Sequence, residues 1–199
     1  DPKEIGYEKI PSKLESKIPK NKFIIGYAGS IGMANALEYL VEASIQLEHK
    51  NKIFFVIVGD GPLKKDLEEK TQEGRNILFY SKIKKSQIQN LISHFDVCFV
   101  GRNDIPLFKH GVSANKYFDY MLSGKPILDS NNNIKDPVEL SECGLIVEPD
   151  STAAIIDGIL KIKSLTEDKR RSMGKMGKRF VIKYHSIANL AKDYTNLFK

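Results

Sequence analysis

The chain has 199 residues, of which 41% are hydrophobic and 28% charged, and its net charge is +6 at pH 7. These values indicate one sizeable core, or at most two small ones, and exclude a low-complexity chain. No apolar run approaches the ~20 residues of a membrane-spanning helix, and no signal-peptide pattern opens the sequence. Because the first residue is Asp1 rather than Met, we expect a segment of a longer protein.

Residues 1–22 mix lysine, glutamate and proline without an apolar period. We expect them to form a linker from an N-terminal domain that lies outside this chain. From residue 23 onward, short runs rich in β-branched and aromatic residues alternate with longer amphipathic stretches. Such runs suit strands that are buried on both faces of a parallel sheet. The strand candidates are residues 23–28, 53–58, 77–80, 97–100, 126–128 and 145–147.

Helical patterns occupy the segments between these runs. Apolar residues recur at helical spacing in 34–48, proline stands in the first turn of 62–72, and 86–95 opens on Ser86 as a candidate cap. After the last strand candidate only helical patterns follow, at about 152–164, 167–183 and 187–198. The alternation predicts an α/β, Rossmann-like, doubly wound parallel sheet of about six strands with helices on both faces.

Cysteine and histidine residues indicate no special chemistry. Cys98 and Cys143 lie in or beside apolar segments without a CxxC spacing, so we expect reduced core residues in a cytoplasmic protein. The four histidines are scattered and show no metal-ligand spacing.

Ligands of such sheets bind beyond the carboxyl ends of the strands, where helix N-termini point. Three loops belong to that edge. "AGSIGMAN" follows the first strand and carries Gly29 and Gly32, which let a ligand approach the backbone closely. "VGDGP" (58–62) follows the second. A tight turn explains either loop about as well as ligand contact does.

The third loop opens "GVSANKYFDYMLSGKPIL" (111–128). Ser113 or Asn115 can cap the helix that follows, and Lys116 adds a full positive charge to the partial charge of its free N–H groups. Asp119 lies one turn deeper on the same helix face. This arrangement suits a nucleoside diphosphate, with its phosphates at the lysine and its ribose hydroxyls at the carboxylate. An ordinary capped helix with a Lys–Asp surface pair remains the alternative.

Several stretches together resemble the C-terminal domain of GT-B glycosyltransferases, and more narrowly the family 4 retaining enzymes (glycosyl transferases group 1) of bacterial polysaccharide synthesis. They are "FIIGYAGSIG", "FFVIVGDGPLKKDLEE", "NILFYSKIKKSQIQNLISHFDVCFV" and "GVSANKYFDYMLSGKPIL", followed by "GLIVEPDSTAAI". The resemblance implies that residues 23–185 form the donor-binding domain and that 186–199 form a helix crossing back to an N-terminal acceptor domain. The chain alone would then be inactive.

The resemblance also implies roles for individual residues. Those expected at the donor phosphates are Gly29, Ser30, Gly32, Ser113, Ala114, Asn115 and Lys116, and Lys116 would stabilise the departing diphosphate. Lys82 and Ile83 would hold the base through backbone groups, and Asp119 would bind the ribose hydroxyls.

Two departures from the family pattern stand out. Gly111 occupies the position, eight residues before Asp119, where many members carry a glutamate near the donor sugar. The uncharged residues 33–35 replace basic residues beside the first glycine loop, so Lys116 is expected to carry more of the phosphate charge. Sugar choice is expected to depend on residues 108–112.

The implied reaction transfers a sugar, with retention, from a UDP-sugar in preference to a GDP-sugar to a hydroxyl of a glycan or lipid-linked acceptor. The family generally needs no metal and no other cofactor, and the sequence has no Asp-x-Asp pair. Three alternatives stay open. They are a nucleotide-binding module without catalysis, a scaffold half that has lost its ligand, and a GT-B-fold sugar-nucleotide epimerase.

A basic segment at 161–183 carries nine lysines and arginines against two acidic residues, a net charge of +7. A solvated helix face, contact with anionic lipid headgroups and contact with an acidic neighbouring domain all fit this charge. Nucleic-acid binding does not, because aromatic side chains do not alternate with the basic ones. We therefore expect a cytoplasmic protein, with peripheral contact at the inner face of the cell membrane as a second expectation.

Overall fold

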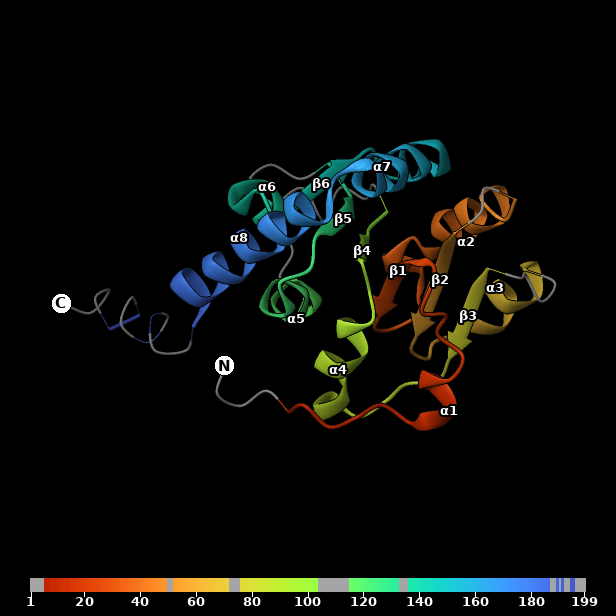
Figure 1. Cartoon of the computed structure of the whole chain (residues 1–199), viewed down its shortest axis with the longest axis horizontal. Coiled ribbons are helices and arrows are strands. Elements are labelled where there is room, and N and C mark those ends of the chain that lie inside the picture. Colours follow the sequence, from red (N-terminus) through yellow and green to blue (C-terminus); the bar gives the residue numbers. More distant parts are fainter. Residues whose placement is uncertain are drawn as a thin grey trace.

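The computed structural model describes residues 6–49, 52–71, 76–103, 115–132 and 136–186, together with 189, 191, 194 and 195. Its centre is a sheet of six parallel strands in the order β3-β2-β1-β4-β5-β6 (Figure 1). The strands are β1 (Phe23–Ala28), β2 (Ile53–Val58), β3 (Ile77–Tyr80), β4 (Val97–Gly101), β5 (Ile127–Ser130) and β6 (Gly144–Val147).

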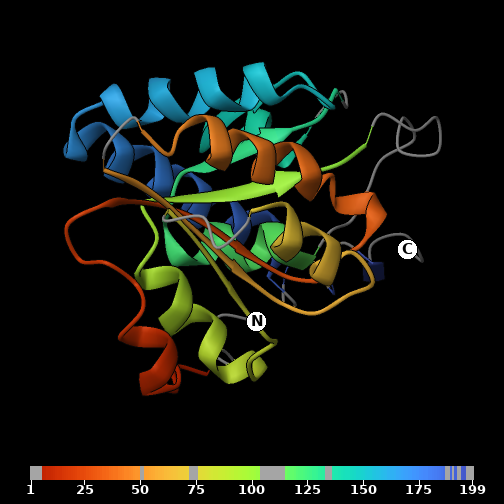
Figure 2. The same ribbon diagram turned by 90° about the vertical axis from the view of Figure 1, so that its right-hand side faces the viewer.

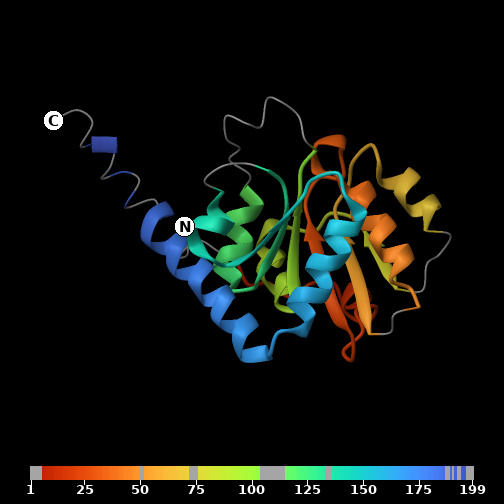
Figure 3. The same cartoon turned by 90° about the horizontal axis from the view of Figure 1, so that it is seen from above.

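Helices cover both faces of this sheet. On one face lie α2 (Leu37–Gln46), α3 (Lys64–Lys70) and α7 (Thr152–Ser164). On the other lie α1 (Ser12–Glu15), α4 (Ile88–Ser93), α5 (Asn115–Ser123), α6 (Pro137–Ser141) and α8 (Glu167–His185). Two 3₁₀ turns, η1 (Met33–Asn35) and η2 (Lys85–Gln87), precede α2 and α4. Figure 2 shows α2 and α4 on opposite sides of the sheet, and Figure 3 shows α8 beside α5.

The central strands are buried on both sides, as their apolar sequences require. In β1, Ile24 packs into the core cluster of one face, and Ile25 and Tyr27 into that of the other. Gly26 of the same strand leaves room for the ring of Phe95, since an added β-carbon would lie 2.0 Å from it. Because side chains alternate along β1, this one strand contributes side chains to the hydrophobic cores on both faces of the sheet.

The predicted fold class is confirmed, with six parallel strands and helices on both faces. β5 begins at Ile127 and continues to Ser130, so it extends past the apolar run 126–128 that predicted it. Its last two residues, Asp129 and Ser130, did not look like strand residues in the sequence because they are polar, yet both are buried. The cap assigned to Ser86 is wrong, since the turn already begins at Lys85. Most of the predicted helix 187–198 lies outside the described residues.

The N-terminal segment departs from the expected irregular pattern. Ile10, Leu14 and Ile18 recur four residues apart and are all buried in the core on the α4 side of the sheet. Sequence analysis missed this helical period because only three apolar residues form it, and many lysines surround them. This segment therefore packs against the domain instead of standing apart from it.

Two further expectations can be compared with the structure. Cys98 and Cys143 are buried free thiols, as predicted. No helix in the described part of the chain is both long and apolar enough to cross a membrane.

Candidate functional site

The loops after β1, β2 and β3 meet at the carboxyl edge of the sheet and enclose a cavity of about 340 Å³. Its lining residues are Gly29, Ser30, Val58, Gly59, Asp60, Lys82, Ile83 and Ile88. Four of these, Gly29, Ser30, Lys82 and Ile83, were predicted to lie at a donor nucleotide. The structure thus brings the first glycine loop and the loop after β3 to one cavity.

The first two loops pack directly against each other. The backbone N–H of Gly29 donates to the carbonyl of Val58 (3.0 Å), and that of Ile31 to the carbonyl of Asp60 (3.0 Å). A β-carbon at Gly61 would lie 2.2 Å from the carbonyl oxygen of Ile31, so only glycine permits this contact. The glycines of "VGDGP" therefore serve the fold.

Gly32 differs from them. Its backbone is extended, with φ −130° and ψ 168°, which any residue can adopt. Among the described residues, an added β-carbon would approach only Ser30 Oγ, at 3.8 Å. The described part of the fold therefore places no demand for glycine here.

Asp60 holds the loop that follows β3. Its Oδ2 accepts a hydrogen bond from the backbone N–H of Lys82 (3.1 Å), and its Oδ1 accepts from Lys64 Nζ (3.1 Å). Lys64 also donates to the hydroxyl of Ser81 (3.1 Å). The Lys82 hydrogen bond, followed by the one from Lys64, lowers the pKa of Asp60. Sequence reasoning treated "VGDGP" as a turn and missed this link to Lys82.

Lys116 points into the first glycine loop from the first turn of α5. Its amino group donates to the hydroxyl of Tyr27 (3.1 Å) and to Asn35 Oδ1. Tyr27 and Asn35 both donate in turn to the carbonyl of Ser30, at 2.5 and 3.0 Å. The Lys116 side chain also passes beside Gly29, whose added β-carbon would lie 3.6 Å from Lys116 Cε. Sequence analysis noted Asn35 only as uncharged and missed it as a partner of Lys116.

The surroundings of Lys116 weaken its hold on a proton. Its pKa is lowered to about 8, first by burial and then by the charge of Arg102, whereas the charge of Asp129 raises it. In the described structure no carboxylate forms an ion pair with this amino group. An anion bound beside Gly29 would supply the missing negative charge.

Asp119 has a different partner. Its Oδ2 pairs with the amino group of Lys85, and its main-chain carbonyl accepts from Gln89 Nε2 (2.9 Å). Lys116 and Asp119 therefore do not form the surface pair that an ordinary helix would explain. Both side chains face the same edge of the sheet but are held by separate loops.

A buried polar cluster lies behind the start of α5. The hydroxyl of Tyr117 donates to Asp129, and Arg102 contacts the Tyr117 hydroxyl and pairs with Asp136 (2.7 Å) and Asp129 (3.4 Å). All four side chains are at most 5% exposed. Burial and then the charge of Asp136 raise the pKa of Asp129 to about 7, against the effect of Arg102. The cluster ties α5 to the ends of β4 and β5, and its signal in the sequence was the polar pair at the end of "PILDS".

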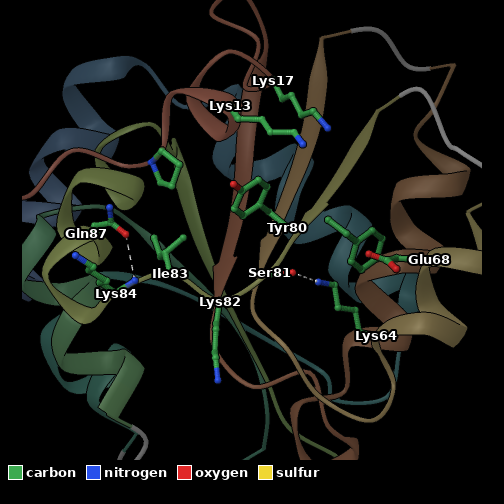
Figure 4. Close-up of a pocket in the computed structure, with 12 residues that line it drawn as sticks. Lys13, Lys17, Lys64, Glu68, Tyr80, Ser81, Lys82, Ile83, Lys84 and Gln87 are labelled. Carbon is green, nitrogen blue, oxygen red and sulfur yellow. Dashed lines mark hydrogen bonds between the residues drawn. The ribbon is translucent and has the colours of Figure 1, made fainter.

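A second cavity, of about 580 Å³, shares Lys82 and Ile83 with the first (Figure 4). Figure 4 shows Lys13 of α1 and Lys17 just after it on one side of Tyr80, while the side chain of Lys82 points away from them. The basic lining consists of Lys13, Lys17, Lys64, Lys82 and Lys84. Lys82 therefore lies between a cavity at the glycine loops and a lysine-rich groove.

The remaining predicted residues are only partly described. Asn115 is the first residue of α5 and is exposed. Ser113, Ala114, Gly111 and residues 108–112 lie outside the described residues. Within the described ranges, no group of three or more His, Cys, Asp or Glu side chains could hold a metal ion.

Comparison with known proteins decides the family. The family model "Glycosyl transferases group 1" matches residues 22–164. The chain belongs to the glycosyl transferases group 1 family. A search among curated proteins found no match.

Solved structures of glycosyltransferases share the fold. A glycosyltransferase from Rickettsia africae superposes with a TM-score of 0.76 at 18% identity, over 100% of this chain and 53% of the other. The C-terminal domain of the group 1 family protein LpcC from Francisella tularensis gives 0.73 at 20% identity, over 94% and 98%. Anabaena HepE in complex with UDP and glucose gives 0.72 at 14% identity, over 96% and 53%.

The coverage shows which part of such proteins this chain resembles. The chain spans 38% to 53% of the length of four of the structures that it matches, but 98% of the isolated LpcC C-terminal domain. At these identities the likeness shows the GT-B fold of the domain. It does not carry the activity of the larger proteins over to this chain.

Proposed function

We propose that this chain is the donor-binding half of a glycosyltransferase that transfers a sugar from a nucleoside-diphosphate sugar to a hydroxyl. The single observation that carries the proposal is the partly buried amino group of Lys116, which lies beside Gly29 with no carboxylate paired to it among the described residues. A cation that has lost part of its hydration is stabilised by an anion bound next to it. The donor's diphosphate is the anion that the family chemistry requires.

The other roles follow from the family resemblance. The Gly29–Gly32 loop and residues 113–115 (Ser113, Ala114 and Asn115) would contact the phosphates, and Lys82 and Ile83 would contact the base. Asp119 would accept hydrogen bonds from the ribose hydroxyls. UDP is favoured over GDP because the structure of HepE, which shares the fold, contains UDP.

In the proposed reaction the bond between the anomeric carbon and the diphosphate breaks, and negative charge grows on the departing phosphate oxygen. Lys116, which is already held beside the first glycine loop, would stabilise that charge with little reorganisation during the step. The oxygen of the attacking hydroxyl forms the new bond to the anomeric carbon, and its proton leaves with the diphosphate or goes to a base of the N-terminal domain. The acceptor, a glycan or a lipid-linked sugar, would be bound by an N-terminal domain, with retention of configuration, and the chain alone would be inactive.

Titration calorimetry of the 199-residue chain with UDP, GDP and ADP tests the proposal. We expect one nucleotide to bind with micromolar to millimolar affinity, and Lys116→Ala and Asp119→Ala each to weaken it by about tenfold or more. Lys175→Ala, on the exposed face of α8, is the matched control and should leave binding unchanged. Tight binding that survives both substitutions, or no binding by a folded chain, would contradict the proposed site and favour a scaffold.

The same proposal includes contact with a membrane that carries the acceptor, at the cytoplasmic face. Helix α8 packs on the domain through Gly174, Gly177 and Val181. Its exposed residues include Arg171, Lys175, Lys178, Arg179 and Lys183. Several lysines and arginines on one face attract anionic headgroups by about 1 kcal/mol each. Sedimentation with vesicles tests this contact. The wild type should sediment with vesicles that contain anionic lipid more than with neutral vesicles, and more than a Lys175→Glu/Lys178→Glu variant does. Equal sedimentation of both proteins would refute the contact.

A further inference from the structure

One short segment connects the two ends of the proposed nucleotide site. Lys82 and Ile83 line the cavity at the glycine loops. Three residues later, Lys85 in η2 reaches α5 and pairs with the carboxylate of Asp119. Gln89, in the first turn of α4, donates to the main-chain carbonyl of the same residue (2.9 Å). The position of Asp119 is therefore fixed twice by the segment that also forms the base cavity.

The Lys85–Asp119 pair joins a lysine, whose side chain is 74% exposed, to a mostly buried carboxylate. Three other ion pairs, such as Glu167 with Arg171, join residues four apart along one chain segment. Lys85 and Asp119 are 34 residues apart and belong to different elements. Asp119 is mostly buried, with 18% of its side chain exposed, and Gln89 is 6% exposed. Lys85 thus contacts the Asp119 carboxylate from the exposed side, and Gln89 binds the Asp119 main-chain carbonyl from the buried side.

The pair also leaves one carboxylate oxygen available. Lys85 occupies Oδ2, and in the described structure no hydrogen bond reaches Oδ1. An ionised carboxylate only accepts hydrogen bonds, and the two adjacent hydroxyls of a ribose are donors. A carboxylate whose rotation is already restricted loses less entropy when it binds such a group.

We propose that Lys85 is a positioning residue that orients the Asp119 carboxylate toward the ribose hydroxyls, so that the site distinguishes ribonucleotides from dideoxyribonucleotides. This inference rests on the proposed function, and in particular on Asp119 as the ribose contact. It adds a residue that does not touch the nucleotide in the proposal but acts through Asp119.

The test compares the affinity of the 199-residue chain for UDP and for 2′,3′-dideoxy-UDP by calorimetry. The ratio of the two dissociation constants isolates the ribose contacts, because base and phosphates are the same. We expect a ratio of about 10 to 100 for the wild type, since hydrogen bonds to a charged group are lost in the analogue. We expect Lys85→Met to lower this ratio by about threefold or more, and Asp119→Ala to bring it close to one.

Lys84→Met is the matched control, because Lys84 is the neighbouring exposed lysine and pairs instead with Glu8 (3.8 Å). It should keep the wild-type ratio, and Lys85→Arg should largely restore it. If Lys85→Met weakens UDP and the dideoxy analogue equally, Lys85 acts on the phosphates and the inference is wrong. It is also wrong if Lys85→Met behaves like Lys84→Met.

The two proposals fail in different ways. Absence of any nucleotide binding by the wild type overturns the proposed function, and the role of Lys85 with it. Wild-type binding with an unchanged ratio in Lys85→Met overturns the role of Lys85 alone. If GDP or ADP binds in place of UDP, its own dideoxy analogue gives the same comparison, because the ribose is common to all three.

Discussion

Two glycine loops lie side by side at the carboxyl edge of this sheet, and they carry glycine for different reasons. In the loop after β2, added β-carbons at Gly59 and Gly61 would lie 1.8 Å and 2.2 Å from backbone oxygens of the neighbouring loop. In the loop after β1, an added β-carbon at Gly32 would meet, among the described residues, only a hydroxyl at 3.8 Å. The first case is explained by packing within the chain. The second is not, and Lys116 passes beside Gly29 of the same loop, where we propose that the ligand binds.

The comparison predicts its largest effect at Gly61. Gly61→Ala should lower the free energy of unfolding by about 3 kcal/mol, because the clash is with the Ile31 backbone, which cannot rotate away. Gly32→Ala, the matched substitution in the other loop, should change it by less than about 0.5 kcal/mol. Urea denaturation of both variants measures the difference. Equal losses would mean that the two loops are under the same packing constraint.

Lys116 gives the next largest effect, through pH. Its pKa of about 8 lies below the ordinary value of lysine because burial disfavours the charged form. The amino group is therefore charged below pH 8 and loses its charge as the pH rises through that value, so an anion should bind more weakly at high pH. Between pH 7 and 9 we expect the affinity for UDP to fall about tenfold, a range above the ionisation of the phosphate itself near 6.

Lys116→Met is the control for this titration, because it removes the group that changes charge. The variant should bind UDP weakly and with little dependence on pH over the same range. Calorimetry at several pH values, in two buffers that differ in ionisation enthalpy, would also detect the proton taken up on binding near pH 8. An equally steep profile in Lys116→Met would assign the dependence to another group.

The sequence was enough to predict the sheet, because continuous β-branched and aromatic runs such as 53–58 have few alternatives to a buried parallel strand. It also predicted that Gly29 and Lys116 would share one edge, since loops after parallel strands meet there, and the family resemblance added Lys82. It could not predict their partners. Asn35 meets Lys116 across 81 positions, and Lys85 meets Asp119 across 34, and neither contact leaves a local pattern.

The buried cluster of Arg102, Tyr117, Asp129 and Asp136 was missed for a related reason. The sequence around each of these residues does not indicate that it is buried. The free-energy cost of burying a charge is offset only when oppositely charged or hydrogen-bonding side chains from other elements pair with it. The packing of the N-terminal segment that contains α1 was missed because its three apolar residues, Ile10, Leu14 and Ile18, stand among many lysines. Local periodicity therefore identified the strands and long helices, whereas long-range polar pairing had to come from the structure.

Gly32 provides the smallest effect and the most direct test of the comparison. If phosphates approach its backbone, the β-carbon of Gly32→Ala should weaken UDP binding by about fivefold while the stability of the free chain stays unchanged. Calorimetry and denaturation on the same preparation measure both quantities. In a Lys116→Met background the effect of Gly32→Ala should be smaller, because both residues act on the same phosphates and their effects are then not additive. A loss of stability without a loss of affinity would instead show that Gly32 serves the fold, as Gly59 and Gly61 do, and the two loops would no longer differ.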